Sequence, residues 1–183
     1  MDSSRLYRLV TAHFRLPLLG VHGVTHWARV FDISSRLAKR TGASLPVVEA
    51  FALLHDVGRE SEGICPRHGA RGADLARVLQ HEVLLLDDVD LHKLVAACEG
   101  HTDGALSDDP TIGTCWDADR LDLGRVGVVP SPGRLCTPAA RDPEMISWAL
   151  LRSRDGREQV PEWIRARWSI PRIPTAATRR LRR

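Results

Sequence analysis

Histidine and aspartate residues that could bind a metal ion recur along this sequence, near the expected ends of helices or beside small residues. Seven of them stand out: His22, His26, His55, Asp56, His68, His101 and Asp119. Imidazoles combined with a few carboxylates suit transition metals better than calcium or magnesium. The sequence therefore predicts a site for one or two divalent ions of iron, manganese, nickel, cobalt or zinc.

The adjacent pair His55 and Asp56 gives the strongest indication of such a site. The pair ends the stretch 47–54, which is apolar on almost every side and is therefore expected to be buried. Burial of an unpaired carboxylate costs several kcal/mol, so the pair needs partners, and a metal ion would provide one. Consecutive helix residues point about 100° apart, so the pair could hold one ion from two directions, or Asp56 could bridge two ions.

The elements that must position these residues are predicted to be helices. Apolar residues recur three and four positions apart, and no segment of strand length alternates apolar and polar residues. The expected helices span residues 5–15, 23–40, 44–58, 68–79, 91–100, 111–124 and 142–150, with a short one from 161. Residues 59–67 and 125–141 are expected to be loops, and the small residues within 69–73 should let another backbone approach closely. We therefore expect an all-α fold in which several helices direct side chains to the centre of a bundle.

The order of these residues resembles the signature of the HD superfamily of metal-dependent phosphohydrolases. That signature is an early histidine, then a His-Asp doublet, then a distal aspartate. His26 in the sequence His-Gly-Val-Thr-His-Trp, the doublet His55-Asp56, and Asp119 in the sequence Asp-Ala-Asp-Arg-Leu-Asp match it in order. The resemblance spans residues 22–124 and implies an all-helical HD-type bundle with a metal site at its centre.

Two further histidines extend the resemblance. His68, followed by Gly-Ala-Arg-Gly-Ala, and His101, followed by Thr-Asp-Gly, resemble the additional histidines of two-metal branches. These branches include bacterial dinucleoside tetraphosphate hydrolases and cyclic-dinucleotide phosphodiesterases.

The resemblance also implies a ligand set and a mechanism. One ion would be held by His26, His55, Asp56 and Asp119, and the second by Asp56, His68 and His101. Two ions roughly 3.5–4 Å apart can hold a bridging water as hydroxide and direct it at phosphorus. Asp56 would then be the central catalytic residue, and metal-activated water would hydrolyse a phosphate ester or anhydride. The expected substrate is a nucleotide or another small phosphorylated metabolite.

Arginines near the motifs are candidates for binding a substrate phosphate. Arg59 follows the His-Asp doublet most closely in the sequence, and Arg71 and Arg125 are the next candidates.

Other aspartates and histidines compete with these six ligands for roles in the site. Asp117 and Asp119 point about 200° apart on a helix and cannot both face one ion, and the Ala-Asp pattern of the family favours Asp119. Asp117 or Asp122 would instead orient a ligand or pair with Arg120 or Arg125. We expect Asp117 and His22 to hydrogen-bond to metal ligands without contacting the metal themselves.

Two other functions are compatible with the same residues. The HD superfamily includes di-iron oxygenases with the same six-ligand set, which would depend on dioxygen and reducible iron. The further alternative is a non-catalytic metal-holding module whose arginine-rich tail contacts nucleic acid in a salt-dependent way. The intact ligand set favours an enzyme, since a chain without catalysis would be free to lose ligands.

Length and composition indicate one domain. A chain of 183 residues that is 43% hydrophobic can bury one core, so we expect one domain over residues 1–164, with its motif core at 22–124. Residues 165–183 hold seven arginines and no acidic residue, and are expected to be a solvated basic tail rather than a nucleic-acid site. The sequence begins with no apolar leader and has no run of about 20 apolar residues, so we expect a cytoplasmic protein without membrane association.

Overall fold

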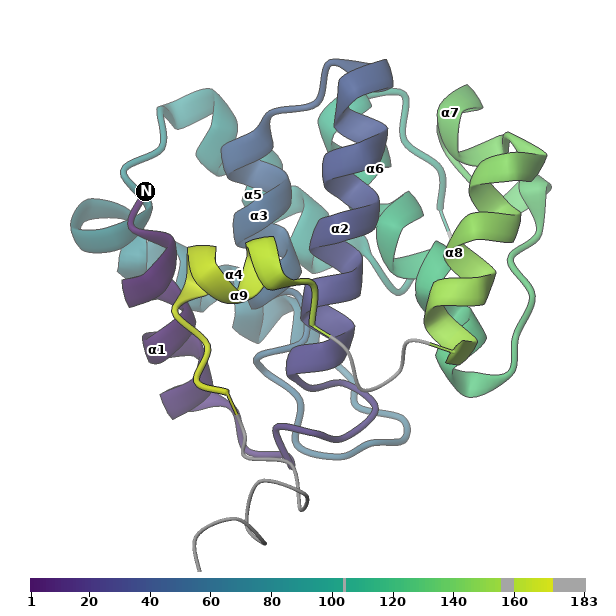
Figure 1. The fold of residues 1–183 in the computed structure, drawn as a ribbon. Coiled ribbons are helices and arrows are strands. Elements are labelled where there is room, and N and C mark those ends of the chain that lie inside the picture. Colours follow the sequence, from purple (N-terminus) through teal and green to yellow (C-terminus); the bar gives the residue numbers. More distant parts are fainter. Residues whose placement is uncertain (104, 156–159, 173–183) are drawn as a thin grey trace, which may run out of the picture.

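Helices form every regular element of the computed structural model within residues 1–103, 105–155 and 160–172, which are the residues that the structure describes (Figure 1). The α-helices are α1 (Ser3–His13), α2 (Val24–Thr41), α3 (Leu45–Leu54), α4 (His68–Leu79), α5 (Asp88–Gly100), α6 (Pro110–Leu121), α7 (Pro138–Arg141), α8 (Pro143–Asp155) and α9 (Glu162–Trp168). A π-helical turn, η1 (Gln80–Leu84), and two 3-10 helices, η2 (Asp122–Val126) and η3 (Pro132–Arg134), extend or connect them. The expected all-α fold class is confirmed. Among the described residues, no helix is both long and apolar enough to span a membrane.

Helix α3 lies in the core because its sequence is apolar on nearly all sides. Every residue from Val47 to Leu54 is buried, including Glu49. Pro46 is tolerated because the N–H groups of the first helical turn have no partner within the helix. Figure 1 shows α3 beside α2, with α1 on one flank and α7 and α8 on the other. The C-terminal end of α3 therefore lies inside the bundle.

The end of α3 comes earlier than the sequence predicts. The helix ends at Leu54 and not at Gly58, and His55 and Asp56 lie in the turn that follows. The backbone of α4 lies against this turn, since a Cβ on Gly72 would overlap the carbonyl oxygen of Leu54. The close backbone approach expected near residues 69–73 is thereby confirmed.

Helix α6 also ends before its predicted limit. It ends at Leu121 and continues as the 3-10 helix η2, whereas the predicted helix extended to residue 124. The segment 125–141, expected to be a loop, contains the short elements η3 and α7.

The C-terminal helix α9 packs on the domain. Trp168 is buried between the rings of Tyr7 and Phe31, and its Nε1 donates a hydrogen bond to Oε1 of Glu49 at 3.0 Å. The expected boundary between residues 164 and 165 falls inside this helix, so residues 165–168 belong to the packed part of the chain. Residues 169–172 of the expected basic tail are described as well, and the part from residue 173 onward lies outside the described residues.

Candidate metal centre

All six predicted ligands meet inside the bundle, although they come from five parts of the chain. His26 lies in the first turn of α2, His55 and Asp56 follow α3, His68 opens α4, His101 follows α5 and Asp119 lies in α6. All are buried except Asp119, whose side chain is 15% exposed. The partly open side of the site is therefore the side of Asp119.

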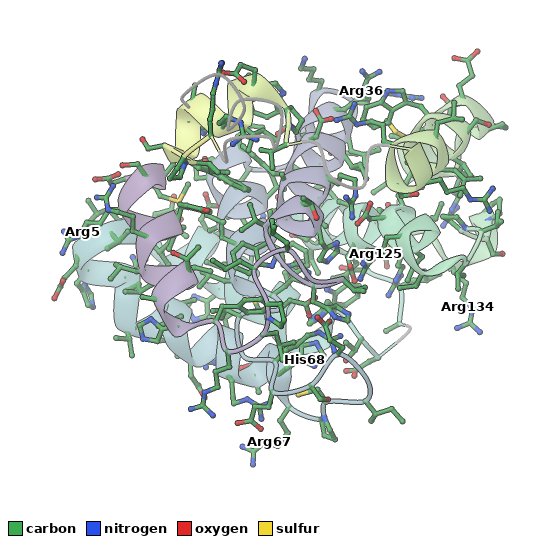
Figure 2. The ribbon with its side chains drawn as sticks, turned by 60° about the horizontal axis from the view of Figure 1, so that its bottom comes forward. Arg5, Arg36, Arg67, His68, Arg125 and Arg134 are labelled. Atoms are coloured by element: carbon green, nitrogen blue, oxygen red, sulfur yellow. The ribbon has the colours of Figure 1, made fainter. Side chains whose placement is uncertain are left out.

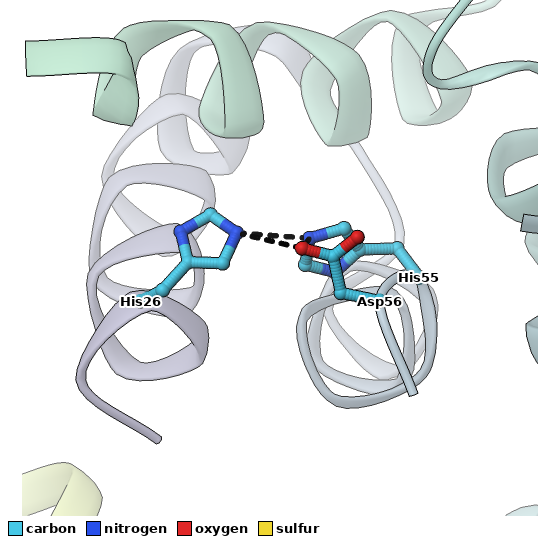
Figure 3. A group of neighbouring side chains, drawn as sticks. All are labelled: His26, His55 and Asp56. Atoms are coloured by element: carbon cyan, nitrogen blue, oxygen red, sulfur yellow. Dashed lines mark hydrogen bonds and ion pairs between the residues drawn. The ribbon is translucent and has the colours of Figure 1, made fainter. Parts of the chain in front are cut away.

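The first group of ligands forms between α2 and the end of α3. The Nε2 atoms of His26 and His55 lie 3.0 Å apart, and each lies 3.5 Å from Oδ2 of Asp56. Figure 3 shows His26 pointing from its helix toward the other two side chains. Oδ1 of Asp119 lies 3.5 Å from Nε2 of His26 and 3.9 Å from Nε2 of His55. His26, His55 and Asp56 could hold one metal ion, with Asp119 at their edge.

The second group of ligands uses the other oxygen of the same carboxylate. The Nε2 atoms of His68 and His101 lie 3.0 Å apart. Oδ1 of Asp56 lies 3.2 Å from Nε2 of His68 and 3.7 Å from Nε2 of His101. These three residues could hold a second ion. Asp56 thus faces one histidine pair with each oxygen, as a carboxylate that bridges two ions would.

The second ring nitrogen of each histidine fixes the orientation of the imidazole. Nδ1 of His26 donates to Oδ2 of Asp122 at 2.7 Å. In the other three histidines Nδ1 donates to a carbonyl oxygen of the preceding turn: Phe51 for His55 (3.0 Å), Cys65 for His68 (2.6 Å) and Cys98 for His101 (2.8 Å). A neutral imidazole that donates from Nδ1 carries its lone pair on Nε2. All four lone pairs therefore point into the site, as metal ligation requires.

The spacing of the facing nitrogens fits a metal ion. Two lone pairs 3.0 Å apart repel each other unless a proton or a cation lies between them. Metal–nitrogen bonds are about 2.0–2.1 Å long, so two nitrogens at about a right angle on one ion stand roughly 3.0 Å apart. Four imidazoles and two carboxylates are also ligands that iron, manganese, nickel, cobalt and zinc accept. The side chains present thus fit one or two divalent transition-metal ions.

Electrostatics inside the site keep His55, Asp56 and Asp119 in the protonation states of ligands. Burial lowers the pKa of His55 to about 3, so its ring is neutral near pH 7. Burial acts to raise the pKa of Asp56, but the neighbouring imidazoles, His55 first, outweigh it and hold the pKa well below its usual range. Burial is outweighed at Asp119 as well, where Arg125 and nearby imidazoles lower the pKa to about 2. The carboxylates therefore remain charged.

His101 has the opposite pKa shift. Burial acts to lower its pKa, but the hydrogen bond with Asp56 outweighs burial and raises it. A metal ion at this position must therefore compete with a proton.

Asp122 is the residue that orients His26, whereas the sequence predicted it only as an alternative to Asp117. Its carboxylate is buried and accepts two further hydrogen bonds from Arg29, at 2.6 Å from Nε and 3.1 Å from Nη2. The spacing offered a signal for this role, because residues three apart lie on the same side of a helix and Asp122 follows Asp119 by three.

The assignment of Asp117 to this role was wrong. Its Oδ1 accepts a hydrogen bond from the backbone N–H of Cys136 at 2.6 Å, and its Oδ2 accepts two from Thr137 at 2.7 and 2.8 Å. Asp117 lies on the far side of α6 from the site because it is about 200° from Asp119 around the helix. It anchors the chain that precedes α7.

His22 lies beside the site without a hydrogen bond to a ligand. Its Nδ1 pairs with Oε2 of Glu62 at 2.5 Å. Its ring lies edge-on to the ring of His26, with centroids 6.2 Å apart. The hydrogen bond to a ligand that the sequence predicts for His22 is not formed, although its ring contacts that of the candidate ligand His26.

Two of the three candidate arginines lie next to ligands. Nε of Arg59 donates to Oδ1 of Asp56 at 2.7 Å. Arg125 lies beside Asp119, and Figure 2 shows it near the centre of the view with His68, whereas Arg134 lies at the periphery.

The third candidate, Arg71, stabilises the loop 59–67 and does not contact a ligand. It donates to the carbonyl oxygens of Gly58 at 2.7 Å and Pro66 at 3.2 Å. Its role is therefore to hold the backbone around the site.

The fold and the site together define an all-helical protein with a candidate centre for one or two metal ions. No protein-family model, curated protein or solved structure matches this chain. What the protein does is thus inferred from the geometry of its own side chains.

Proposed function

We propose that this protein is a metal-dependent phosphohydrolase of the HD type, which hydrolyses a phosphate ester or anhydride bond of a nucleotide or small phosphorylated metabolite. The observation that carries the proposal is the position of Asp56, whose two oxygens face two different histidine pairs. A carboxylate so placed can bridge two ions, and paired ions are typical of phosphatases, nucleases and related enzymes.

The positions of the six candidate ligands indicate which of them would hold each metal ion. His26, His55, Asp56 and Asp119 would hold one ion, and Asp56, His68 and His101 the other. Bound ions would supply positive charge for the phosphoryl oxygens and lower the pKa of water that they bind. The fixed Nδ1 hydrogen bonds mean that the four imidazoles present their lone pairs without rearrangement.

Positive charge at the site supports an anionic substrate. The side chains of Arg59 and Arg125 are 12% and 7% exposed, and they lie next to Asp56 and Asp119, respectively. Guanidinium groups at the edge of a metal site are suited to bind phosphate oxygens. A neutral substrate of an oxygenase would not need them, so we favour hydrolysis over the di-iron oxygenase alternative.

The non-catalytic alternative has less support. It requires tail arginines that are free to contact nucleic acid, but Arg167 forms two hydrogen bonds of 2.6 Å with Glu49, and Arg172 pairs with Glu162 at 2.7 Å. The other arginines of the tail, apart from Arg165 in α9, lie outside the described residues.

The test is metal analysis of the purified protein, followed by turnover of a panel of nucleotides and phosphomonoesters after loading with each candidate metal. Asp56→Ala should abolish both turnover and tight metal binding, because it removes a ligand from both groups. Asp74→Ala is a matched control, since Asp74 is exposed on α4 and, among the described residues, pairs only with Arg77.

Two results would overturn the proposal. Full activity in Asp56→Ala would remove the site from the reaction. Turnover that consumes dioxygen and requires reduced iron, with no phosphate released from any substrate, would assign the site to the oxygenase class.

A further inference from the structure

Arg125 has a buried guanidinium group whose hydrogen-bonding capacity is largely unused. Its side chain is 7% exposed, and its Nε and Nη1 atoms are buried without a hydrogen-bond partner among the described residues. The nearest carboxylate oxygens, on Asp119 and Asp122, lie 3.7 Å from its Nη2 and Nη1 atoms, which is too far for hydrogen bonds. Buried donors without acceptors are costly, so this arrangement is expected only where something else supplies the acceptors.

The acceptor position adjoins the first histidine pair. Nη2 of Arg125 approaches Oδ1 of Asp119, and the same oxygen lies 3.5 Å from Nε2 of His26. That oxygen is also buried without a hydrogen-bond partner. Oδ1 of Asp119 is therefore close to both the guanidinium group of Arg125 and the imidazole of His26.

Packing holds the backbone of Arg125 in place. The residue lies in η2, and a Cβ on the preceding Gly124 would overlap Oγ of Ser153 in α8. The 3-10 helix is then capped by Gly127, whose φ of +83° is in the left-handed region that favours glycine. Arg125 is thus presented to the site by a segment seated against α8.

We propose that Arg125 binds a phosphoryl oxygen of the substrate next to the first metal position, and that this role belongs to Arg125 and not to Arg59. The inference rests on the proposed function and names the residue that recognises the anionic group. Planar guanidinium groups bind phosphate through two parallel N–H···O bonds, and Arg125 has donors available for them.

Arg59 is less suited to this role because its Nε and Nη1 atoms already have acceptors. Its Nε donates to Asp56 at 2.7 Å, and its Nη1 donates to the carbonyl oxygen of Gly63 at 3.2 Å. It neutralises the bridging carboxylate and ties it to the loop 59–67.

The experiment measures binding of inorganic phosphate to the full chain loaded with Mn²⁺, by calorimetry, together with metal content and the KM and kcat of the best phosphate ester. Arg125→Gln should weaken phosphate binding by about tenfold to a hundredfold and raise KM, with metal content unchanged. Arg125→Lys keeps the charge without the planar fork and should lose less. Arg134→Gln is the matched control, because Arg134 is exposed and distant from the site.

Other outcomes would overturn the inference. If Arg125→Gln loses metal while each remaining loaded site binds phosphate normally, Arg125 is only a counter-ion for Asp119. If the wild type hydrolyses phosphate esters and both Arg125 variants keep its KM and phosphate affinity, the proposed function stands and this inference fails. If the loaded wild type neither binds phosphate nor hydrolyses any ester, both fail.

Discussion

His26 and Asp122 are 96 positions apart in the sequence, yet Nδ1 of His26 donates to Oδ2 of Asp122 at 2.7 Å inside the bundle. The same carboxylate accepts two hydrogen bonds from the buried Arg29. Burial acts to raise the pKa of Asp122, but His26 and Arg29 outweigh it and lower the pKa, so the carboxylate stays charged. Asp122 therefore sets the tautomer and direction of His26, a candidate metal ligand, without facing the metal position itself.

Replacing Asp122 should weaken metal binding without removing a ligand. In Asp122→Asn the hydrogen bond to His26 loses its charge, and we expect metal affinity to fall by about 10–100-fold. Stability should also fall, by about 3–5 kcal/mol, because Arg29 loses its buried counter-ion. Competition with a chelator measures the affinity. Asp142→Asn, near the surface beside Arg40, is the control, and equal affinities in both variants would contradict the role of Asp122.

Replacing a histidine of the second pair should remove one metal ion and leave the other bound. His68→Ala or His101→Ala removes a ligand from the second group only, so the metal content of the loaded protein should fall toward one ion per chain. Elemental analysis after gel filtration gives the count. His92→Ala, exposed on α5, should leave the count unchanged. A full metal content in both the His68 and the His101 variants would remove these residues from the ligand set.

Gly69, which is not a candidate ligand, should also affect metal binding by the second group of ligands. A Cβ on Gly69 would overlap the carbonyl oxygen of Cys98 and lie 3.1 Å from the ring of His101. Gly69→Ala should therefore push α5 from α4, cost about 1–3 kcal/mol and reduce metal content as the histidine variants do. Gly63→Ala has nothing within 4 Å of its new Cβ and should behave as the wild type. Thermal unfolding and metal analysis of the two variants make the comparison.

The metal-free protein should lose stability in acid partly through His55. The pKa of His55 is about 3 in the folded chain, and its ordinary value, expected in the unfolded chain, is 6.5. Between these two pH values the unfolded chain therefore binds more protons than the folded chain. Stability therefore falls as pH falls from 6.5 toward 3. His101 acts in the opposite direction because its pKa is raised.

Urea denaturation of the metal-free wild type and His55→Gln at pH 7 and pH 5 isolates this contribution. The loss of stability between the two pH values should be smaller in the variant. Equal losses would show that His55 does not resist protonation in the folded state.

Two tryptophans of α9 should differ sharply in their contribution to stability. Trp168 is fully buried against Phe31 and Tyr7, so Trp168→Ala should cost about 3–5 kcal/mol. Trp163 is 46% exposed, and Trp163→Ala should cost about 1 kcal/mol or less. Urea unfolding compares the two. A cost for Trp168→Ala no larger than that for Trp163→Ala would mean that α9 contributes little to the domain.

The sequence was sufficient to predict that the regular elements are helices and to name the six residues that converge. Helical periodicity is a local property, because apolar residues three and four apart form one face wherever the helix lies. The candidate ligands could be named because His26, His55-Asp56 and Asp119 occur in the order of the HD signature that the sequence resembles, and because a buried His-Asp pair such as His55-Asp56 needs a partner.

Only the tertiary structure decided which carboxylate hydrogen-bonds to a candidate ligand and which arginine has hydrogen-bond donors without acceptors. The hydrogen bond of His26 to Asp122, the unpartnered donors of Arg125 and the packing of Trp168 all depend on how helices far apart in the sequence are rotated against each other. One position along a helix turns a side chain by about 100°, so a small difference in packing decides whether it faces the site, another helix or solvent. That rotation is set by contacts between distant segments, and local sequence does not contain it.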